Sequence, residues 1–241
     1  MVVKSELKLI KNLQQKKYRN EKGLFVMEGK KAVEELLESG FEVFKLYSMD
    51  QKLRGSWASQ VQAISMKELK QVSSLKNPNG VLGVFYKKSI PSLDMDGWTL
   101  VLDDVQDPGN LGTIIRLCDW FGIENIICSK ETVDCYNPKV LQATMGSIVR
   151  VNIFYMDLAE FLKSAEVPVF GTFMEGENIH KTKLPEKGIL IMGNEGNGIS
   201  EPIRSLCNHE ISIPQFGKKT TESLNVATAT AIFLNEIKRR G

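Results

Sequence analysis

The sequence predicts an α/β protein with two domains, the second of them built on a mostly parallel β-sheet. The chain has 241 residues, a length that suits two domains. From Trp98 onward, nearly continuous apolar stretches alternate with helical patterns, as expected of parallel strands covered on both faces. The segment directly before Trp98, residues 87–97, is polar and rich in Pro, Ser, Asp and Gly. We therefore expect a small α/β domain in residues 1–90, a linker in 91–97 and the parallel-sheet domain in 98–241.

In the first domain, three helices and four strands are expected. Apolar residues at helical spacing predict one amphipathic, basic helix over residues 5–19. A second helix spans 30–40 and ends at Gly40, a residue type suited to the position after a helix C-cap. A third helix is expected at 66–74. The expected strands of this domain are residues 23–29, 41–49, 61–65 and 80–87.

In the second domain, six strands and five helices are expected in alternation. The strands, apolar along most of their length, are expected at residues 98–103, 124–129, 151–155, 168–173, 188–193 and 209–214. The helices between and after them are expected at residues 111–122, 137–147, 157–165, 200–207 and 223–240.

Positive charge is concentrated at the N-terminal end of the chain. The net charge is +2, but residues 1–31 alone carry nine Lys or Arg against three acids. Such a distribution fits contact with a polyanion such as nucleic acid. A solvated helix face explains a lysine-rich helix equally well, so charge alone does not decide the function.

The sequence also argues against several classes of protein. No apolar run approaches the length of a membrane helix, and the N-terminus lacks the pattern of a secretory signal. The four cysteines form no C-x-x-C pair and do not cluster with the two histidines, so no metal site is expected. We expect buried, free thiols and a cytoplasmic protein without a membrane partner. The glycine run at 193–198 has neither the spacing nor the position of a dinucleotide fingerprint, which disfavours a nicotinamide enzyme.

Three loops at expected strand ends suit a ligand. In the first, Asn110 can cap a helix, and Gly112 leaves the backbone uncovered one turn before Arg116. The apolar residues of this helix share one face, which should meet the sheet: Leu111, Ile114, Ile115 and Cys118. Arg116 falls on the opposite face, with Trp120 one turn further on. An exposed arginine is most often merely solvated, so this position alone does not establish a function.

The second and third loops lie nearer the C-terminus. In the second, Gly193, Gly196 and Gly198 surround Glu195 and allow the backbone to approach a bound molecule, although a simple tight turn has the same composition. In the third, a strand ends at Pro214, and Ser223 or Glu222 opens the last helix. Asn225 is expected in its first turn, where asparagine is a poor helix former, so a side-chain role or an ordinary helix-start role is open.

Together and in this order, the three loops resemble the SpoU (TrmH) family of S-adenosylmethionine-dependent RNA ribose methyltransferases of the SPOUT superfamily. The resemblance covers about residues 98–240, and the first domain resembles the RNA substrate-binding domain that these enzymes often carry. The chain departs from the family pattern in a slightly longer loop before Ser223 and in Ala227, where serine is frequent. These departures leave the closure of that loop open.

The resemblance implies a deep trefoil knot, a homodimer with residues of both subunits in the active site, and S-adenosyl-L-methionine as cofactor. The residues implied in catalysis are Arg116, Asn110, Glu195, Ser223 and Asn225. Those implied in binding the donor are Thr172, Gly193, Asn194, Gly196, Ile213 and Leu224. The substrate would be the 2′-hydroxyl of a ribose in structured RNA, ribosomal or transfer RNA. A catalytically inactive RNA-binding protein with the same fold is the alternative.

For Arg116, the resemblance implies a part in activating the 2′-hydroxyl. A guanidinium is a poor proton acceptor because its pKa lies above about 12. We therefore expect Arg116 to hold a phosphate of the target nucleotide bidentately, and the phosphate or Ser223 to take the proton. Asn110 would bond the target ribose or fix the arginine loop.

Overall fold

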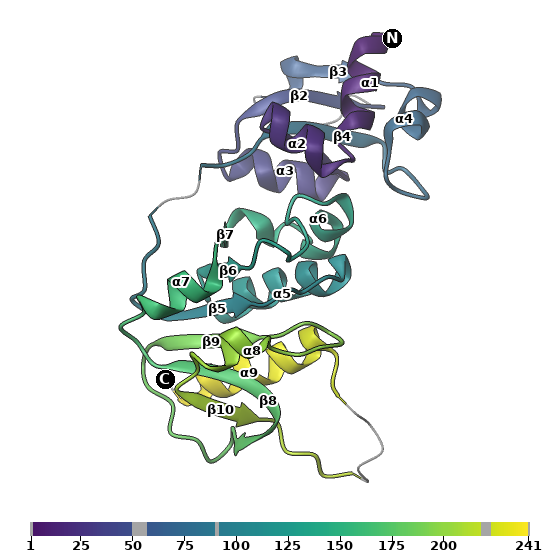
Figure 1. Ribbon diagram of the computed structural model, residues 1–241. Helices are drawn as coiled ribbons and strands as arrows, with labels where there is room; N and C mark the ends of the chain where they lie inside the picture. Colours follow the sequence, from purple (N-terminus) through teal and green to yellow (C-terminus); the bar gives the residue numbers. More distant parts are fainter. Residues whose placement is uncertain (1, 50–56, 90–91, 218–222, 241) are drawn as a thin grey trace. The chain divides into compact units, whose positions relative to one another are not determined.

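The computed structural model describes residues 2–49, 57–89, 92–217 and 223–240 of the chain (Figure 1). The chain forms two compact units, each with its own sheet. The first unit comprises residues 1–89 together with 134–149, and the second comprises 90–133 together with 150–241. The predicted domain limits concern continuous stretches of sequence and stay a prediction.

The first unit is a four-stranded sheet with helices packed against it. The strand order is β1-β4-β2-β3, with β4 antiparallel to β1 and β2, and β2 parallel to β3. All four expected strands form. The elements are α1 (Lys4–Asn12), α2 (Lys16–Lys22), β1 (Leu24–Glu28), α3 (Lys30–Glu38), β2 (Val43–Ser48), β3 (Val61–Ala63), α4 (Met66–Val72), β4 (Val81–Tyr86) and α6 (Pro138–Thr144), with 3₁₀ helices at Ala58–Gln60 and Ser147–Val149.

The prediction of a single N-terminal helix over residues 5–19 is wrong, because this segment forms two helices, α1 and α2. Gln15 adopts an extended conformation, which ends one helix and starts the next. The break is stabilised by Arg19, whose Nη1 donates to the backbone oxygens of Leu13 and Gln14 at 2.9 and 2.8 Å. The buried side chain of Arg19 thus replaces the N–H donors that these two backbone oxygens would have had in a continuous helix.

The same Arg19 forms a buried ion pair within the first unit. Its side chain is 2% exposed, and Nη2 and Nε donate to Oδ2 of Asp134 at 2.6 and 3.0 Å. Asp134→Ala should destabilise this unit by about 3–5 kcal/mol, because it leaves a buried guanidinium without its counter-charge. Urea unfolding monitored by fluorescence measures the loss.

The matched control for that substitution is Asp119→Ala, which removes the partner of Arg150 in a pair whose arginine is 47% exposed. Exposed pairs contribute about 1 kcal/mol or less, so this variant should unfold near the wild-type urea concentration. Equal unfolding midpoints for Asp134→Ala and Asp119→Ala would contradict a structural role for the buried pair.

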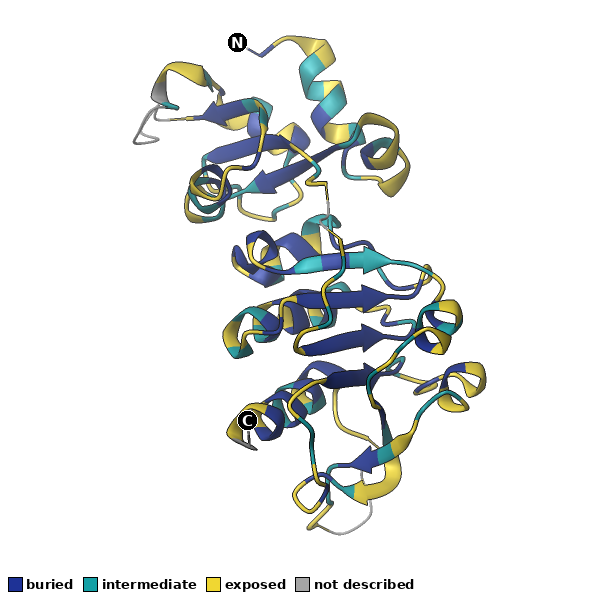
Figure 2. Ribbon diagram, turned by 90° about the vertical axis from the view of Figure 1, so that its left-hand side faces the viewer, coloured by how far each residue is buried: buried dark blue, intermediate teal, exposed yellow. Residues whose placement is uncertain are grey.

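The second unit is a six-stranded sheet in which every neighbouring pair of strands is parallel, in the order β10-β8-β9-β5-β6-β7. This confirms the predicted parallel-sheet α/β fold. The elements are β5 (Trp98–Leu102), α5 (Pro108–Phe121), β6 (Asn125–Cys128), β7 (Asn152–Tyr155), α7 (Leu158–Lys163), β8 (Val169–Asn178), β9 (Gly188–Met192), α8 (Glu201–Arg204), β10 (His209–Ser212) and α9 (Val226–Arg240). The central strands are buried between helices on both faces (Figure 2). Helices α5 and α9 pack against each other.

Two helix starts differ from the expectation, and both differences concern candidate site residues. The N-cap of α5 is Asp107, whose Oδ1 accepts the N–H of Asn110 at 2.8 Å, so Asn110 lies in the first turn. The cap of α9 is Asn225, whose Oδ1 accepts the N–H groups of Ala227 and Thr228 at 3.0 and 3.2 Å. A capping side chain satisfies N–H groups that a helix leaves unpaired. Ser223 precedes the helix, and Glu222 lies outside the described residues.

The four cysteines form no disulfide, as expected, and three are buried whereas Cys207 is half-buried. Within the described part of the chain, no helix is long and apolar enough to cross a membrane. Among the same residues, no three His, Cys, Asp or Glu side chains form a group able to hold a metal ion.

Candidate functional site

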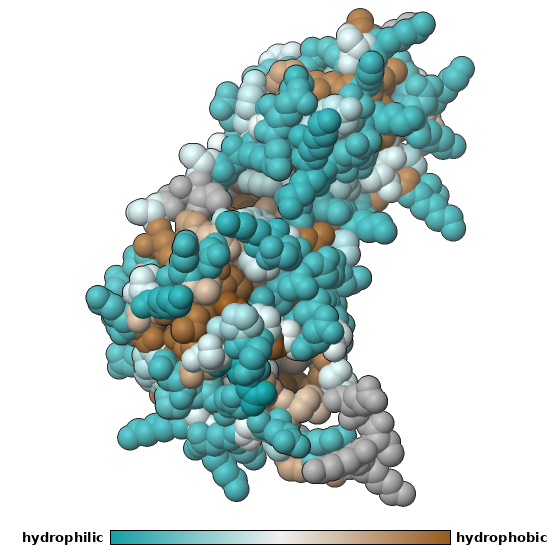
Figure 3. Space-filling model, viewed as in Figure 1, coloured by the Kyte–Doolittle hydropathy of each residue, from teal (hydrophilic) through white to brown (hydrophobic). Residues whose placement is uncertain are grey.

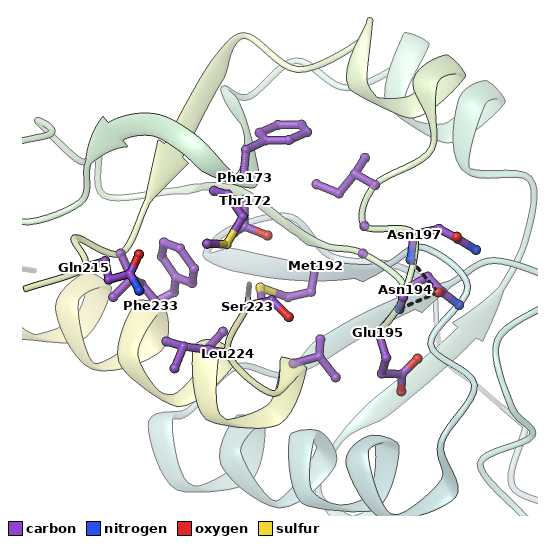
Figure 4. A pocket seen from close by; sticks show the side chains of 18 of the residues that line it. Thr172, Phe173, Met192, Asn194, Glu195, Asn197, Gln215, Ser223, Leu224 and Phe233 are labelled. Atoms are coloured by element: carbon purple, nitrogen blue, oxygen red, sulfur yellow. Dashed lines mark hydrogen bonds between the residues drawn. The ribbon is translucent and has the colours of Figure 1, made fainter. Parts of the chain in front are cut away.

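The second unit contains a cavity of about 800 Å³ where β9 and β10 end and α9 begins (Figure 4). Its described walls come from β8, the end of β9 and the loop after it, the end of α8, the segment after β10, and α9 with the residues before it. The carboxyl ends of parallel strands are the usual place for a ligand in an open α/β sheet. The position of the cavity therefore makes it the candidate site.

Eight of the eleven candidate residues line this cavity: Thr172, Gly193, Asn194, Glu195, Gly196, Ile213, Ser223 and Leu224. The set includes every residue expected to bind the donor. Asn110 is not among the lining residues but donates to Glu195, which is, and Asn225 in turn donates to Asn110. Arg116 lies apart. Sequence reasoning missed lining side chains on β8, β9 and α9, among them Phe173, Met192 and Phe233. In the sequence these residues lie in apolar patterns that look like those of core positions. Only Met192, which directly precedes the glycine loop, could have been recognised as a lining residue.

The loop after β9 is closed on itself by its backbone. Asn194 and Gly198 exchange two backbone hydrogen bonds of 2.9 and 3.0 Å, and Gly198 has a φ of +69°. A Cβ at Gly193 would lie 2.2 Å from the carbonyl carbon of Gly198, so any side chain there would force the loop open. The glycines at 193 and 198 are thus required by a close approach and a positive φ.

Asn194 holds this loop in place from within. Its Oδ1 accepts the N–H groups of Gly196 and Asn197 at 2.9 and 3.0 Å, and its Nδ2 donates to the backbone oxygen of Asp104 at 2.7 Å. Both ends of the side-chain amide are therefore engaged within the protein. The structure gives Asn194 a positioning role, and its expected contact with the donor stays a prediction.

A chain of side chains joins the three predicted loops. Oε1 of Glu195 accepts the N–H of Asp107 at 3.0 Å and Nδ2 of Asn110 at 2.9 Å, and Oε2 accepts the N–H of Gln106 at 3.1 Å. Oδ1 of Asn110 accepts Nδ2 of Asn225 at 2.9 Å. The first loop is thus bonded on one side to the loop after β9 and on the other to the start of α9. We call Glu195, Asn110 and Asn225 the loop-joining chain.

These bonds keep Glu195 ionised. Burial by itself raises the pKa of the carboxyl group, but the hydrogen bonds from Asn110 and from the backbone of Gln106 and Asp107 outweigh burial, and the net effect lowers the pKa below its ordinary value. Glu195 is therefore a permanently charged acceptor at neutral pH. It is unsuited to proton transfer in that range.

The lowered pKa of Glu195 predicts how the site responds to acid. A carboxyl group with a lowered pKa in the folded state contributes stability above its ordinary value of 4.5 and loses that contribution as the pH falls through the lowered value. Thermal unfolding should therefore show a constant contribution from this group at neutral pH and a loss in acid. Glu195→Gln should lack this part of the acid dependence. Identical pH profiles for the two proteins would contradict the assignment.

Arg116 lies outside the cavity on the exposed face of α5, as expected. Leu111, Ile114 and Ile115 are fully buried on the other face. No hydrogen bond or ion pair from a described residue holds the guanidinium of Arg116, and Trp120, one turn away, is 82% exposed. Arg116 is therefore available to a partner that is not part of this chain.

Thr172, Ile213 and Leu224 form less polar parts of the cavity wall. Oγ1 of Thr172 donates to the backbone oxygen of Ile191 at 2.9 Å, which fixes β8 to the carboxyl end of β9. Leu224 is 48% exposed, a large value for an aliphatic side chain facing a cavity. An apolar group bound there would remove that surface from water.

Comparison with known proteins identifies the family. The model of the SpoU rRNA methylase family matches residues 97–235, and the model of the MRM3-like substrate binding domain matches residues 4–83. The chain belongs to the SpoU rRNA methylase family. The predicted family and the class of enzyme, an RNA methyltransferase, are thereby confirmed.

Relatives and solved structures cover the whole chain. The 23S rRNA (guanosine(2553)-2'-O)-methyltransferase RlmP of Bacillus subtilis is 30% identical over 95% of this chain and 94% of the relative. A TrmH-family putative RNA methyltransferase from Porphyromonas gingivalis is 33% identical, with a TM-score of 0.91 and full coverage of both chains. The AdoMet-bound rRNA methyltransferase of Sinorhizobium meliloti is 30% identical, with a TM-score of 0.89, covering 100% of this chain and 96% of that one. The cofactor of that structure is the one predicted for this chain.

Proposed function

We propose that this chain transfers a methyl group from S-adenosyl-L-methionine to the 2′-hydroxyl of a ribose in RNA. The observation that carries the proposal is the loop-joining chain, which bonds the first of the three loops to the two loops that line the cavity. Residues 85 and 115 positions apart in sequence are bonded there. Such a network is expected of loops that bind one ligand together.

The cavity suits the donor. Its volume of about 800 Å³ falls in the range of small-molecule sites. Gly193 and Gly196 line the cavity without side chains, and Ile213 and Leu224 offer apolar surface to an adenine ring. When bound, the donor supplies an electrophilic methyl group on its sulfonium sulfur. The chain's part is to hold the donor with Thr172, Gly193, Asn194, Gly196, Ile213 and Leu224.

The chain's remaining task is to place the ribose hydroxyl and remove its proton. Positioning alone supplies much of the rate of such a displacement. In the proposal, Arg116 binds a phosphate of the target nucleotide through two parallel N–H donors. The phosphate or Ser223, which lines the cavity, accepts the proton, because the guanidinium of Arg116 cannot. Glu195 and Asn225 hold the loops in register.

We further propose that the enzyme acts as a homodimer. Arg116 does not line the cavity of its own chain, yet it lies on a helix face that also exposes Trp120. A second copy that covers this face would bury the indole ring and bring Arg116 to its partner's cavity. A site formed by both subunits would then explain the position of this arginine.

The trefoil knot belongs to the same proposal. Knots are rare in proteins, and strand order alone does not produce one. Two features support threading of the C-terminal segment: β8 lies between β10 and β9 in the sheet, and α9 returns from the far edge to pack against α5.

For the RNA, we propose that the first unit supplies most of the contact. Its N-terminal helices carry exposed lysines: Lys4, Lys8, Lys11, Lys16, Lys17 and Lys22. The face shown in Figure 3 is largely hydrophilic over this unit. The binding would weaken steeply with added salt and would favour loops or bulges, whose riboses can reach a pocket. We propose a cytoplasmic enzyme acting on ribosomal or transfer RNA.

Transfer of labelled methyl groups tests the proposal. The protein is incubated with labelled S-adenosylmethionine and unmodified ribosomal or transfer RNA, and the RNA is digested to nucleosides for mass spectrometry. The proposal predicts label in a 2′-O-methylnucleoside. Label on a base would contradict the ribose assignment, and binding of both RNAs without any transfer would favour the inactive RNA-binding protein.

A further inference from the structure

A positively charged side chain that belongs to none of the three loops lines the cavity. Arg204, the last residue of α8, lines the cavity together with Phe173 of β8. The guanidinium carbon of Arg204 lies 4.5 Å from the centre of the Phe173 ring. Its Nε and Nη2 donate to Oε1 and Oε2 of Glu210 at 2.7 and 2.8 Å. The ring and the carboxylate together fix the plane of the guanidinium.

This arrangement leaves three of the five N–H donors of the guanidinium without a described partner. A guanidinium has five N–H donors, and Glu210 takes two of them along one edge. The N–H groups of Nη1, with the second N–H of Nη2, form another fork, and no described residue bonds to Nη1. A planar fork of this kind matches the two oxygens of a carboxylate.

The charge of Arg204 is distinctive in its surroundings. Among the described residues that line the cavity, only Arg204 and Glu195 are charged. Glu195 is occupied by the N–H groups of Gln106, Asp107 and Asn110. An anionic group bound in the cavity therefore finds a cation there that is held in a defined orientation.

We infer that Arg204 binds the α-carboxylate of the donor's methionine moiety through its free fork, and that Phe173 and Glu210 act as positioning residues for it. The inference rests on the proposed function, which supplies the donor. S-adenosylmethionine and its product S-adenosylhomocysteine both carry this carboxylate. Arg204 thus distinguishes ligands with an amino-acid tail from adenosine thioethers that lack one.

Two ligands isolate this contact. S-adenosylhomocysteine carries the carboxylate, whereas 5′-methylthioadenosine keeps the adenosine and the thioether but has no amino-acid tail. Titration calorimetry should show that Arg204→Gln weakens S-adenosylhomocysteine binding about tenfold, the low end for a charge-assisted pair because the side chain is 44% exposed. The affinity for 5′-methylthioadenosine should be unchanged.

Matched variants separate this role from a structural one. Arg150→Gln removes another exposed arginine of the same unit that is paired with a carboxylate, and should leave both affinities unchanged. Glu210→Gln and Phe173→Leu should reduce the preference for S-adenosylhomocysteine by a smaller factor, since they only loosen the fork.

The other outcomes overturn the inference. Equal loss for both ligands in Arg204→Gln would show a structural role, and no loss for either would show no contact. Unchanged ligand binding with weakened RNA binding would assign the fork to an RNA phosphate instead. Failure of the wild-type protein to bind either ligand would contradict the proposed function itself, which is a distinguishable result.

Discussion

Arg116→Ala is expected to slow methyl transfer about 100-fold or more while leaving the affinity for S-adenosylhomocysteine unchanged. The side chain is exposed and lies outside the cavity, so its loss removes no contact to the donor. The loss falls on the target nucleotide, whose phosphate would no longer be held, and misplacement of a reacting group by about 1 Å can cost about 100-fold in rate. Single-turnover kinetics with saturating RNA measure the effect.

Two further variants sharpen this prediction. Arg116→Lys keeps the charge but cannot bind a phosphate through two parallel donors, so it should restore only part of the rate. Lys163→Ala removes an exposed cation at the end of α7 and should have the wild-type rate. The assignment is wrong if Arg116→Ala binds RNA and donor normally and still transfers methyl groups at the wild-type rate.

Glu195→Gln should weaken S-adenosylhomocysteine binding and methyl transfer together. The carboxylate accepts three N–H groups, from Gln106, Asp107 and Asn110, and an amide in its place would point its own N–H groups at one of these donors. Leaving such groups unsatisfied costs about 1–3 kcal/mol, so we expect the affinity to fall about tenfold or more as the loops separate.

The loop-joining chain also predicts coupling between its members. Asn110→Ala and Asn225→Ala should each weaken donor binding, and the double variant should lose less than the sum, because either change breaks the bond between them. Glu160→Gln, on the exposed surface of α7, is the control for a lost carboxylate. Two results together would show that these three side chains do not join the loops: strictly additive losses of donor affinity for Asn110→Ala and Asn225→Ala, and an unchanged donor affinity in Glu195→Gln.

Much of the fold follows from local patterns in the sequence. Apolar runs of strand length marked the strands of both sheets, and the spacing of Leu111, Ile114, Ile115 and Cys118 correctly placed Arg116 on the exposed face of α5. The break between α1 and α2 could not be predicted this way, because it depends on Arg19, whose partner Asp134 is 115 residues away. The same is true of segment 134–149, whose place in the first unit depends on tertiary contacts.

The composition of the site was predictable in part. Glycine and asparagine at strand ends pointed to the three loops, and the family resemblance supplied the candidate residues. The helix starts at Asp107 and Asn225 were not found, because several polar residues near each start are capable of capping. The fork of Arg204 was also missed. Its neighbour Phe173 comes from β8, which only the folded sheet brings near α8, and the pair with Glu210 six residues further on does not by itself indicate a site.

A crystal structure of the protein with S-adenosylhomocysteine would probe the central idea most directly. We predict that the ligand occupies the cavity of about 800 Å³ and touches the loop after β9, the segment after β10 and the start of α9, with the bonds among Glu195, Asn110 and Asn225 intact. A ligand bound elsewhere on the protein, or one seated in the cavity with these three side chains drawn apart, would contradict it.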